Sequence, residues 1–485
     1  MSRRRFIGNT AMATAGFTIL PSNVVSGLGH KAPSDKLNIV GVGVGGRGAG
    51  VLRPMQSENI IGLADVDWRY SKPVFDSYPN AKKYWDYRKM FDEMGRDIDA
   101  VVVATSDHTH AIVAADAMTM GKHVYVEKPL THTVYESRLL TKMADKYQVA
   151  TQMGNQGSSD EGVNLCREWI ANGEIGEVTR VDSFTDRPIW PQGLNIPEPQ
   201  TAPDTIDWDL FIGPAPMRPY NEIYTPWNFR GWWDFGTGAL GDMACHVLHP
   251  VFMGLELGYP TRVQGSSTLL LTDCAPVAQK VKLVYPARTP SQNMKVRLPE
   301  VTVNWYDGGI RPEMPDGWPA GRDMNNEGGG VIFYGTKDIL VAGCYGRNPW
   351  LLSGRVPNAP KFVRRVPTNH YMDWVRACKE TPANRVQTAS AFHEAGPFNE
   401  MVVMGVLAVR LQALNKELEW NGEDMRFTNI GSDETLRTVI EDGFKIEDGH
   451  PTFAKTWTDH MNAQQFASDL INRPYRSGWR LPAMP

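Results

Sequence analysis

Three side chains capable of acid–base chemistry lie close together in the sequence, at Asp242, His246 and His249. Their four- and three-residue spacing would place them on one face of a helix. His246 titrates near neutrality and can act as a general base, while Asp242 can orient the imidazole or bind an adjacent hydroxyl group. Two other interpretations stay open: a metal site made by the three side chains, or a capping aspartate beside packed histidines.

A lysine with catalytic potential, Lys128, follows an apolar run at residues 123–126. The run is expected to form a strand, with Glu127-Lys128-Pro129 as the turn at its end. Oxidation of a secondary alcohol needs a base for the hydroxyl proton and a cation or donor for the developing alkoxide. A desolvated lysine can polarise the hydroxyl group or share its proton. The alternative is an ordinary surface lysine.

A glycine-rich turn predicts a dinucleotide site near the N-terminus. The apolar run 37–40 is expected to be a strand, and it leads directly into glycines that satisfy GxGxxG at Gly41, Gly43 and Gly46. In this motif the first glycine permits a tight turn and the second lets the backbone approach a pyrophosphate. The third lets the following helix pack close to the strand, with its N-terminal amides facing the anion.

An acidic residue at the end of the next expected strand favours NAD over NADP. The run 60–64 ends in Asp65, and Asp67 follows two positions later. A carboxylate at this place can accept hydrogen bonds from the adenosine ribose and repels a 2′-phosphate. We assign the ribose contact to Asp65 because it is nearest the strand end; two solvated turn aspartates are the alternative.

Strands and helices alternate through this first part of the chain. Apolar runs at 98–104 and 149–153 also end in polar side chains. This order predicts a doubly wound parallel sheet of the Rossmann type, which binds ligands at the carboxyl ends of its strands. The candidate cofactor-binding residues are Gly41, Gly43, Gly45, Gly46, Arg47, Asp65, Thr105, His108, Glu127 and Asn155.

Aromatic residues are frequent around the Asp242 motif, between positions 190 and 235. Flat aromatic faces stack on the C–H surfaces of sugar rings, and Arg and Asp side chains satisfy ring hydroxyls. We therefore take Arg187 and Trp190 as candidate substrate contacts, together with His249, although about half of such rings must serve the core.

With these motifs in view, the chain from about Lys36 onward resembles the Gfo/Idh/MocA family of NAD(P)-dependent oxidoreductases. The markers are the glycine turn, Ala104-Thr-Ser-Asp-His-Thr-His110, the Glu127-Lys128-Pro129 turn and Gly238-Ala-Leu-Gly-Asp-Met-Ala-Cys-His246. Two departures are Ser106, where relatives often have proline, and His249, where many have an acidic residue. The second departure concerns the substrate contacts and leaves the residues expected to carry out the oxidation in place.

The resemblance implies an α/β chain with two main domains. The Rossmann domain would be followed by an α+β domain with an open, mostly antiparallel sheet, which carries a sugar pocket and often the oligomer interface. Alternating patterns between 263 and 306 agree with antiparallel strands. The expected domains are a leader at 1–35, a Rossmann domain at 36–155, a substrate-binding domain at 156–420 and a tail at 421–485. Relatives also imply a homo-oligomer, a carbohydrate substrate, a cis peptide before Pro129 and no catalytic metal.

Composition excludes several other classes of protein. The 485 residues carry 50 basic and 54 acidic side chains, a net charge of −4 that gives no reason to expect nucleic acid. Five widely spaced cysteines form no CxxC pair and signal neither a zinc site nor a disulfide framework. No run reaches the roughly 18 apolar residues of a membrane span.

The first residues are expected to be an export signal. Ser2-Arg-Arg-Arg-Phe-Ile7 precedes a short uncharged stretch, in an order that resembles a twin-arginine signal and predicts a periplasmic location. A disordered basic tail is the alternative. An exported enzyme would lack the cytosolic NAD pool, so its cofactor would have to be bound tightly and reset in place.

Two enzymatic hypotheses follow from these observations. The first is an NAD-dependent sugar or glycoside dehydrogenase that uses Lys128, His246 and Asp242. The second is a redox-neutral, NAD-dependent glycosidase or lyase, similar to the α-N-acetylgalactosaminidase branch of the family, that acts through a transient keto-sugar; Lys128 favours the first. A carbohydrate-binding protein with a structural NAD is a third, non-enzymatic interpretation.

Overall fold

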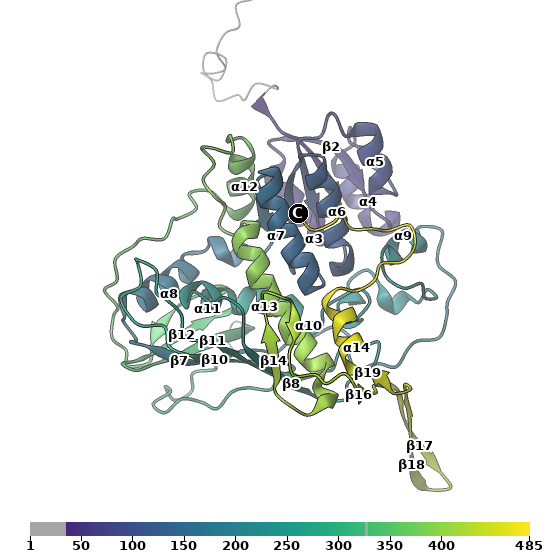
Figure 1. The fold of residues 1–485 in the computed structure, drawn as a ribbon. Helices are drawn as coiled ribbons and strands as arrows, with labels where there is room; N and C mark the ends of the chain where they lie inside the picture. The colour runs from purple at the N-terminus through teal and green to yellow at the C-terminus, as the bar shows by residue number, and fades with distance from the viewer. Residues whose placement is uncertain (1–34, 325–327) are drawn as a thin grey trace, which may run out of the picture.

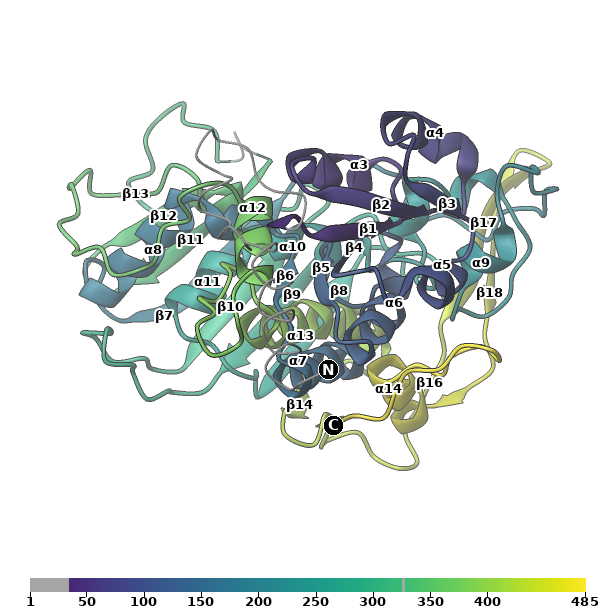
Figure 2. The same cartoon turned by 90° about the horizontal axis from the view of Figure 1, so that it is seen from above.

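The computed structural model describes residues 35–324 and 328–485. Its N-terminal part (purple to blue in Figure 1) is a six-stranded sheet in the order β3-β2-β1-β4-β5-β6, with every neighbouring pair parallel; Figure 2 labels the six strands. This is the expected Rossmann sheet. The export signal predicted for residues 1–35 falls almost entirely outside the described residues. The strands are β1 (Asn38–Val42), β2 (Asn59–Ala64), β3 (Lys82–Tyr84), β4 (Ala100–Val103), β5 (His123–Val126) and β6 (Thr151–Met153).

Helices cover both faces of this sheet, which explains why its strands are almost continuously apolar. Alternate strand residues serve the two faces: Ile39 packs in the core formed with α3, α4 and α12, whereas Val40 packs in the core formed with α5, α6 and α7. A capping box between Thr133 and Glu136 starts α7. The helices of this part are α3 (Arg47–Leu52), α4 (Trp68–Ser77), α5 (Tyr87–Met94), α6 (Asp107–Thr119) and α7 (Val134–Tyr147).

The second part of the chain forms a nine-stranded sheet in the order β13-β12-β11-β7-β10-β9-β8-β14-β15 (Figures 1 and 2). Only the pair β7 and β10 is parallel, so the sheet is open and mostly antiparallel, as expected. Its strands are β7 (Val178–Thr185), β8 (Arg262–Ser267), β9 (Gln279–Tyr285), β10 (Val301–Tyr306), β11 (Gly329–Gly335), β12 (Ile339–Gly343), β13 (Trp350–Leu351), β14 (Leu418–Asn421) and β15 (Arg426–Phe427).

Helices of the second part contain the buried Asp242 motif and connect the two sheets. The long helix α13 packs against α7 on one side and against β8 and β9 on the other, and it also contacts α10. The helices are α8 (Glu161–Asn172), α9 (Trp208–Ile212), α10 (Gly238–Val247), α11 (His249–Gly254), α12 (His370–Cys378) and α13 (Phe392–Arg410). Short 3-10 turns lie at η3 (Gln156–Ser159), η5 (Asn228–Gly231) and η6 (Cys344–Gly346).

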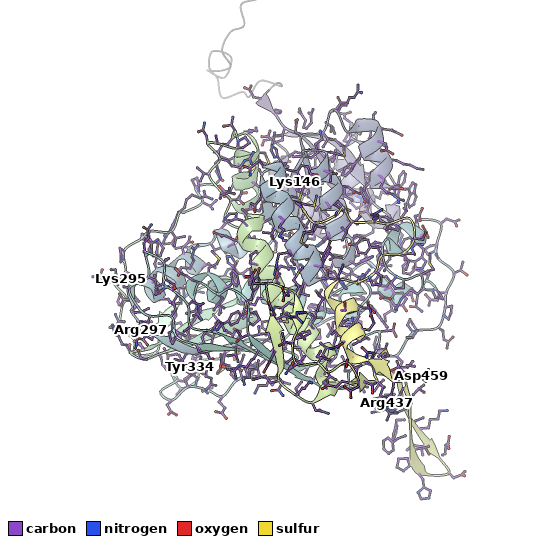
Figure 3. All side chains as sticks on the ribbon, viewed as in Figure 1. Lys146, Lys295, Arg297, Tyr334, Arg437 and Asp459 are labelled. Atoms are coloured by element: carbon purple, nitrogen blue, oxygen red, sulfur yellow. The ribbon has the colours of Figure 1, made fainter. Side chains whose placement is uncertain are left out.

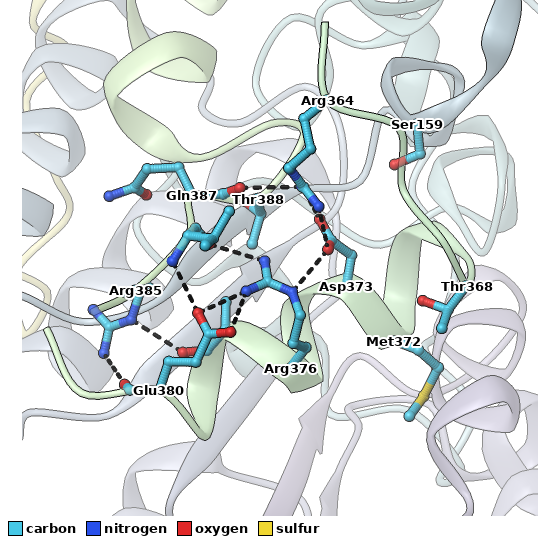
Figure 4. A network of polar contacts seen from close by, with 12 residues as sticks. Ser159, Arg364, Thr368, Met372, Asp373, Arg376, Glu380, Arg385, Gln387 and Thr388 are labelled. Atoms are coloured by element: carbon cyan, nitrogen blue, oxygen red, sulfur yellow. Dashed lines mark hydrogen bonds and ion pairs between the residues drawn. The ribbon is translucent and has the colours of Figure 1, made fainter.

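A late segment of the chain returns to the Rossmann sheet through α12, whose Trp374 is fully buried beside Tyr125. An ion-pair network holds this segment: Arg364 and Arg376 both bind the buried carboxylate of Asp373 (Figure 4). Arg385 donates to the carbonyl oxygen of Gln148 at the end of α7. The Rossmann part of the chain is therefore completed by residues more than 200 positions downstream.

The tail beyond residue 421 packs on the body and also projects from it. A hairpin of β17 (Val439–Glu447) and β18 (His450–Trp457) extends outward, with Arg437 and Asp459 at its base (Figure 3), and the tail continues into α14 (Ala463–Ile471). A short bridge between β16 (Thr435–Leu436) and β19 (Met461–Asn462) closes the base. Among the described residues, no helix has the length and apolar character needed to span a membrane. The homo-oligomer stays a prediction.

Candidate active site

A cavity of about 340 Å³ lies where β1, β2, β4 and β5 of the Rossmann sheet end. Residues from both parts of the chain form its wall, so the nucleotide-binding turns face the helix that carries the Asp242 motif. Of the predicted site residues, the wall includes Gly43, Gly45, Arg47, Asp65, Thr105, Glu127, Lys128, Asp242 and His246.

The glycine turn follows the expected chemistry, but its register differs from the prediction. Gly41 lies inside β1, and the turn begins at Gly43, which has a φ of 74°. A Cβ on Gly43 would stand 2.6 Å from the backbone nitrogen of Thr105, and a Cβ on Gly48 would overlap the carbonyl oxygen of Gly43. The fingerprint is therefore Gly43, Gly45 and Gly48, a second GxGxxG that overlaps the first.

This register corrects the roles predicted for two glycines. Gly41 lies under α3, where a Cβ would meet Val44 and Leu52, and it does not reach the cavity. Gly46 is the N-cap residue of α3 with a φ of 52°, and the close helix–strand contact belongs to Gly48. Because β1 extends to Val42, the first glycine of the motif pattern is still a strand residue.

Asp65 lies at the end of β2 and organises the glycine turn. Its Oδ2 accepts hydrogen bonds from the backbone amides of Val44 and Gly45 at 2.8 and 2.9 Å, and its Oδ1 accepts from the amide of Asp67. Loss of solvent raises the pKa of Asp65 to about 6, against the opposing effect of these amides. Asp67 instead caps α4 by accepting from the amide of Tyr70.

The residues around the turn fit a dinucleotide. The glycine cradle leaves no room for side chains, Asp65 is part of the cavity wall, and Arg47 is held against Glu127 by a 2.8 Å ion pair. Asn155, at the end of β6, is buried with both amide atoms unpartnered among the described residues. These features are those expected of an NAD-binding Rossmann domain.

The centre of the site is a buried carboxylate between two cations. Asp242, on α10, accepts hydrogen bonds at its Oδ1 from Lys128 Nζ at 2.7 Å and from Arg230 Nε at 2.8 Å. Lys128 Nζ also donates to the Asp242 carbonyl oxygen. The two positive charges hold the pKa of Asp242 well below its usual range although burial opposes them. Asp242 therefore positions Lys128 and Arg230; no hydrogen bond joins it to His246 in the described part of the chain.

His246 lies one helical turn after Asp242 and also faces the cavity. Burial, together with the charge of Lys128, holds the pKa of His246 well below its usual range, so its imidazole is neutral at pH 7. Its Nδ1 has no hydrogen-bond partner among residues 35–324 and 328–485. The centroid of the Tyr345 ring lies 4.5 Å from the centroid of the imidazole. The backbone of Tyr345 has a φ of 64°.

Several predicted site residues lie outside the cavity wall. His108, on the first turn of α6, has its ring nitrogens 3.0 and 3.3 Å from the carbonyl oxygens of Phe211 and Phe235, and burial lowers its pKa to about 3. It is a structural histidine; its neighbour Asp107 reaches the cavity. Asn155, described above, is also absent from the wall, although the adjacent Gln156 is part of it.

The three predicted substrate contacts are likewise separated from the cavity. Trp190 is buried and donates its indole N–H to Gln192, while Arg187 pairs with Asp186. His249 starts α11 and packs edge-on against Phe398. The described residues contain no group of three His, Cys, Asp or Glu side chains arranged to hold a metal. Asp242 instead forms ion pairs with the side chains of Lys128 and Arg230.

Arg230, Asp107 and Tyr345 belong to the cavity wall but were not among the site residues predicted from the sequence. The Arg230 guanidinium lies 3.8 Å from the centroid of the Trp227 ring and also forms an ion pair with Asp242. Nothing in its spacing from Asp242 marks it; an arginine within an aromatic segment was the one available signal. Tyr345 comes from η6, next to the edge of the large sheet, and only the fold brings it to His246.

Two profiles of known protein families match this chain. Residues 36–155 match the Gfo/Idh/MocA family profile described as oxidoreductase family, NAD-binding Rossmann fold, and residues 170–288 match its C-terminal alpha/beta domain. The chain is similar to the WlbA dehydrogenase of Chromobacterium violaceum, solved with NADH and UDP-GlcNAcA, with a TM-score of 0.53 and 15% identity over 84% of this chain and 99% of that one. At this identity the likeness concerns the fold.

Three curated relatives are similar over shorter stretches. Inositol 2-dehydrogenase of Salmonella paratyphi B is 28% identical over 29% of this chain and 43% of its own length. Levoglucosan dehydrogenase of Pseudarthrobacter phenanthrenivorans is 30% identical over 34% of each chain. Glycosyl hydrolase family 109 protein 1 of Akkermansia muciniphila is 32% identical over 22% of this chain and 25% of its own. The chain thus spans less than half the length of these relatives.

Proposed function

We propose that this chain, which carries both domains of the Gfo/Idh/MocA oxidoreductase family, transfers a hydride between a secondary hydroxyl of a sugar or glycoside and a tightly bound nicotinamide. The observation that carries this proposal is the placement of Lys128, Asp242 and His246 in the same cavity as the Gly43 turn and Asp65. The base, the cation and the dinucleotide site thus face one another.

The side chains divide the work of alcohol oxidation. NAD, when bound, accepts the hydride. His246 takes the hydroxyl proton, because its imidazole is neutral and lies in the cavity wall. Lys128 donates a hydrogen bond to the hydroxyl oxygen and stabilises the negative charge that develops there. Asp242 holds the lysine ammonium in place, and Arg230 shares that carboxylate.

Two features support NAD and a carbohydrate as the reactants. Asp65 presents a carboxylate at the ribose position of the fold, which disfavours a 2′-phosphate. Trp227 and Phe229 line the cavity near Arg230, and aromatic faces next to a guanidinium suit the C–H and hydroxyl surfaces of a sugar. The inositol and levoglucosan dehydrogenases point to the same class of substrate.

We also propose that residues 1–35 are a twin-arginine export signal that takes the protein to the periplasm, on the basis of the Ser2-Arg-Arg-Arg-Phe-Ile7 order. In that compartment the bound cofactor would have to be reset within the protein, either by a second substrate or by redox-neutral chemistry. The glycosyl hydrolase family 109 relative supports the redox-neutral glycosidase as a second candidate.

An absorbance spectrum of the purified protein in the nicotinamide band, before and after addition of a panel of sugars and glycosides, tests the proposal. A lasting NADH signal with one of them supports the dehydrogenase. Consumption of a glycoside without lasting NADH supports the redox-neutral glycosidase. Absence of both effects across the panel contradicts both.

A further inference from the structure

The last residues of the chain reach the cofactor cavity. Trp479 belongs to the cavity wall together with Tyr87, and the guanidinium of Arg88 lies 4.3 Å from the centroid of the Trp479 ring. Tyr87 and Arg88 open α5, directly after β3. Because the adenosine half of a dinucleotide lies beside the ends of the second and third strands of this fold, Trp479 stands at the adenosine end.

The tail that carries Trp479 is fastened to the body by two neighbouring residues, Tyr475 and Arg476. The hydroxyl of Tyr475 donates to Glu136 on α7 at 2.7 Å. The backbone amide of Arg476 donates to the carbonyl oxygen of Pro214, and its side chain forms a 2.6 Å ion pair with Asp209 on α9. In Figure 1 this yellow segment runs from α14 past α9 to the Rossmann domain.

The partner of the tail, α9, is itself part of the cavity wall through Leu210 and Phe211. The segment before α9 is attached to the end of β2, where Trp68 donates its amide to the carbonyl oxygen of Thr205 and Asp207 donates to that of Val66. Two segments that do not belong to the Rossmann domain thus meet over its adenosine side, and Arg476 joins them.

We propose that the C-terminal segment 473–479 is a clasp that retains the dinucleotide by closing the adenosine end of its site, with Trp479 as the contact residue and Arg476 as the positioning residue. The proposal rests on the NAD site of the proposed function and deepens it. A closed adenosine end slows cofactor release while the opposite end, at Lys128 and His246, stays available to substrate. Such retention is what a cofactor reset in place requires.

The dissociation rate of NAD from the purified holoprotein tests the clasp without any sugar present. The holoprotein is diluted into NAD-free buffer, and released NAD is consumed and counted by an added NAD-dependent dehydrogenase. Removing an aromatic side chain that stacks on a nucleobase costs about 1–3 kcal/mol of binding free energy. Trp479→Ala should therefore speed the release of NAD by about five- to 150-fold. Trp479→Phe should restore most of the retention, and the exposed neighbour Arg480→Ala should leave it unchanged.

Each outcome decides the matter. Equal release from Trp479→Ala and the unsubstituted protein overturns the clasp, as does rapid release from the unsubstituted protein itself. If Trp479→Ala does not fold, Arg476→Ala must release NAD faster than Arg480→Ala, or the clasp is again overturned. Slow, Trp479-dependent release with no hydride transfer from any sugar would contradict the proposed function and leave the clasp standing.

Discussion

Replacement of Asp242 by Asn should destabilise the protein more than replacement of Asp242 and Lys128 together. The carboxylate lies 2.7 Å from Lys128 Nζ and 2.8 Å from Arg230 Nε, and all three side chains are largely buried. In Asp242→Asn the two cations face each other without a counter-charge. Removing one partner of a buried ion pair costs about 3–5 kcal/mol, and we expect a loss of that size in the free energy of unfolding.

The double substitution Lys128→Met with Asp242→Asn removes one of the uncompensated charges. Its free energy of unfolding should therefore exceed that of Asp242→Asn alone by at least about 1 kcal/mol, because residues in one ion-pair network are not additive. Urea unfolding of the two single variants and the double variant measures this cycle. Asp76→Asn is the control: its pair with Lys72 is exposed, and such pairs contribute about 0–1 kcal/mol.

The effect of Asp242 should also depend on pH in one direction. Its pKa is lowered in the folded protein, so the stability it contributes is present above the unfolded pKa of about 4 and is lost as the pH falls further. The difference in the free energy of unfolding between the unsubstituted protein and Asp242→Asn should thus become smaller toward low pH. Two results would refute this reasoning. One is that Asp242→Asn lowers the free energy of unfolding by less than about 1 kcal/mol at pH 7. The other is that the double variant is less stable than Asp242→Asn.

Three further predictions concern catalysis and the cofactor. Lys128→Met should slow hydride transfer by about 10²–10³-fold with NAD still bound, because it removes one donor to the developing alkoxide; single-turnover absorbance measures the rate, and an unchanged rate would remove Lys128 from the mechanism. Asp65→Ala should weaken NAD binding and reduce discrimination against NADP, and NAD affinity of the unsubstituted protein should fall as the pH drops through about 6, where this carboxylate takes up a proton; titration calorimetry checks both, and pH-independent binding would reassign the ribose contact. Gly48→Ala should lower NAD affinity and the unfolding temperature because its Cβ overlaps the Gly43 carbonyl oxygen, whereas Gly258→Ala, with open space around it, should not; equal behaviour of the two would contradict the revised register.

Local sequence was enough to predict the Rossmann sheet and most of its turns. The apolar runs, the glycines and the acidic residue after β2 are short-range signals, since strand burial and tight turns depend on neighbours in the chain. The spacing of Asp242 and His246 on one helix was predictable for the same reason. Where two overlapping glycine patterns existed, however, only the observed end of β1 at Val42 decided between Gly41 and Gly43 as the first glycine.

The type of fold, the place of the glycine turn after the first strand and the position of Lys128 at a strand end follow from local sequence patterns. The tertiary structure decided which partner each polar group meets: Asp242 binds Lys128 and Arg230 rather than His246, His108 faces backbone carbonyls, and Trp479 reaches the cavity from the end of the chain. The physical reason is that these contacts join residues far apart in the chain, and their formation depends on how the two sheets and the tail pack rather than on any local periodicity.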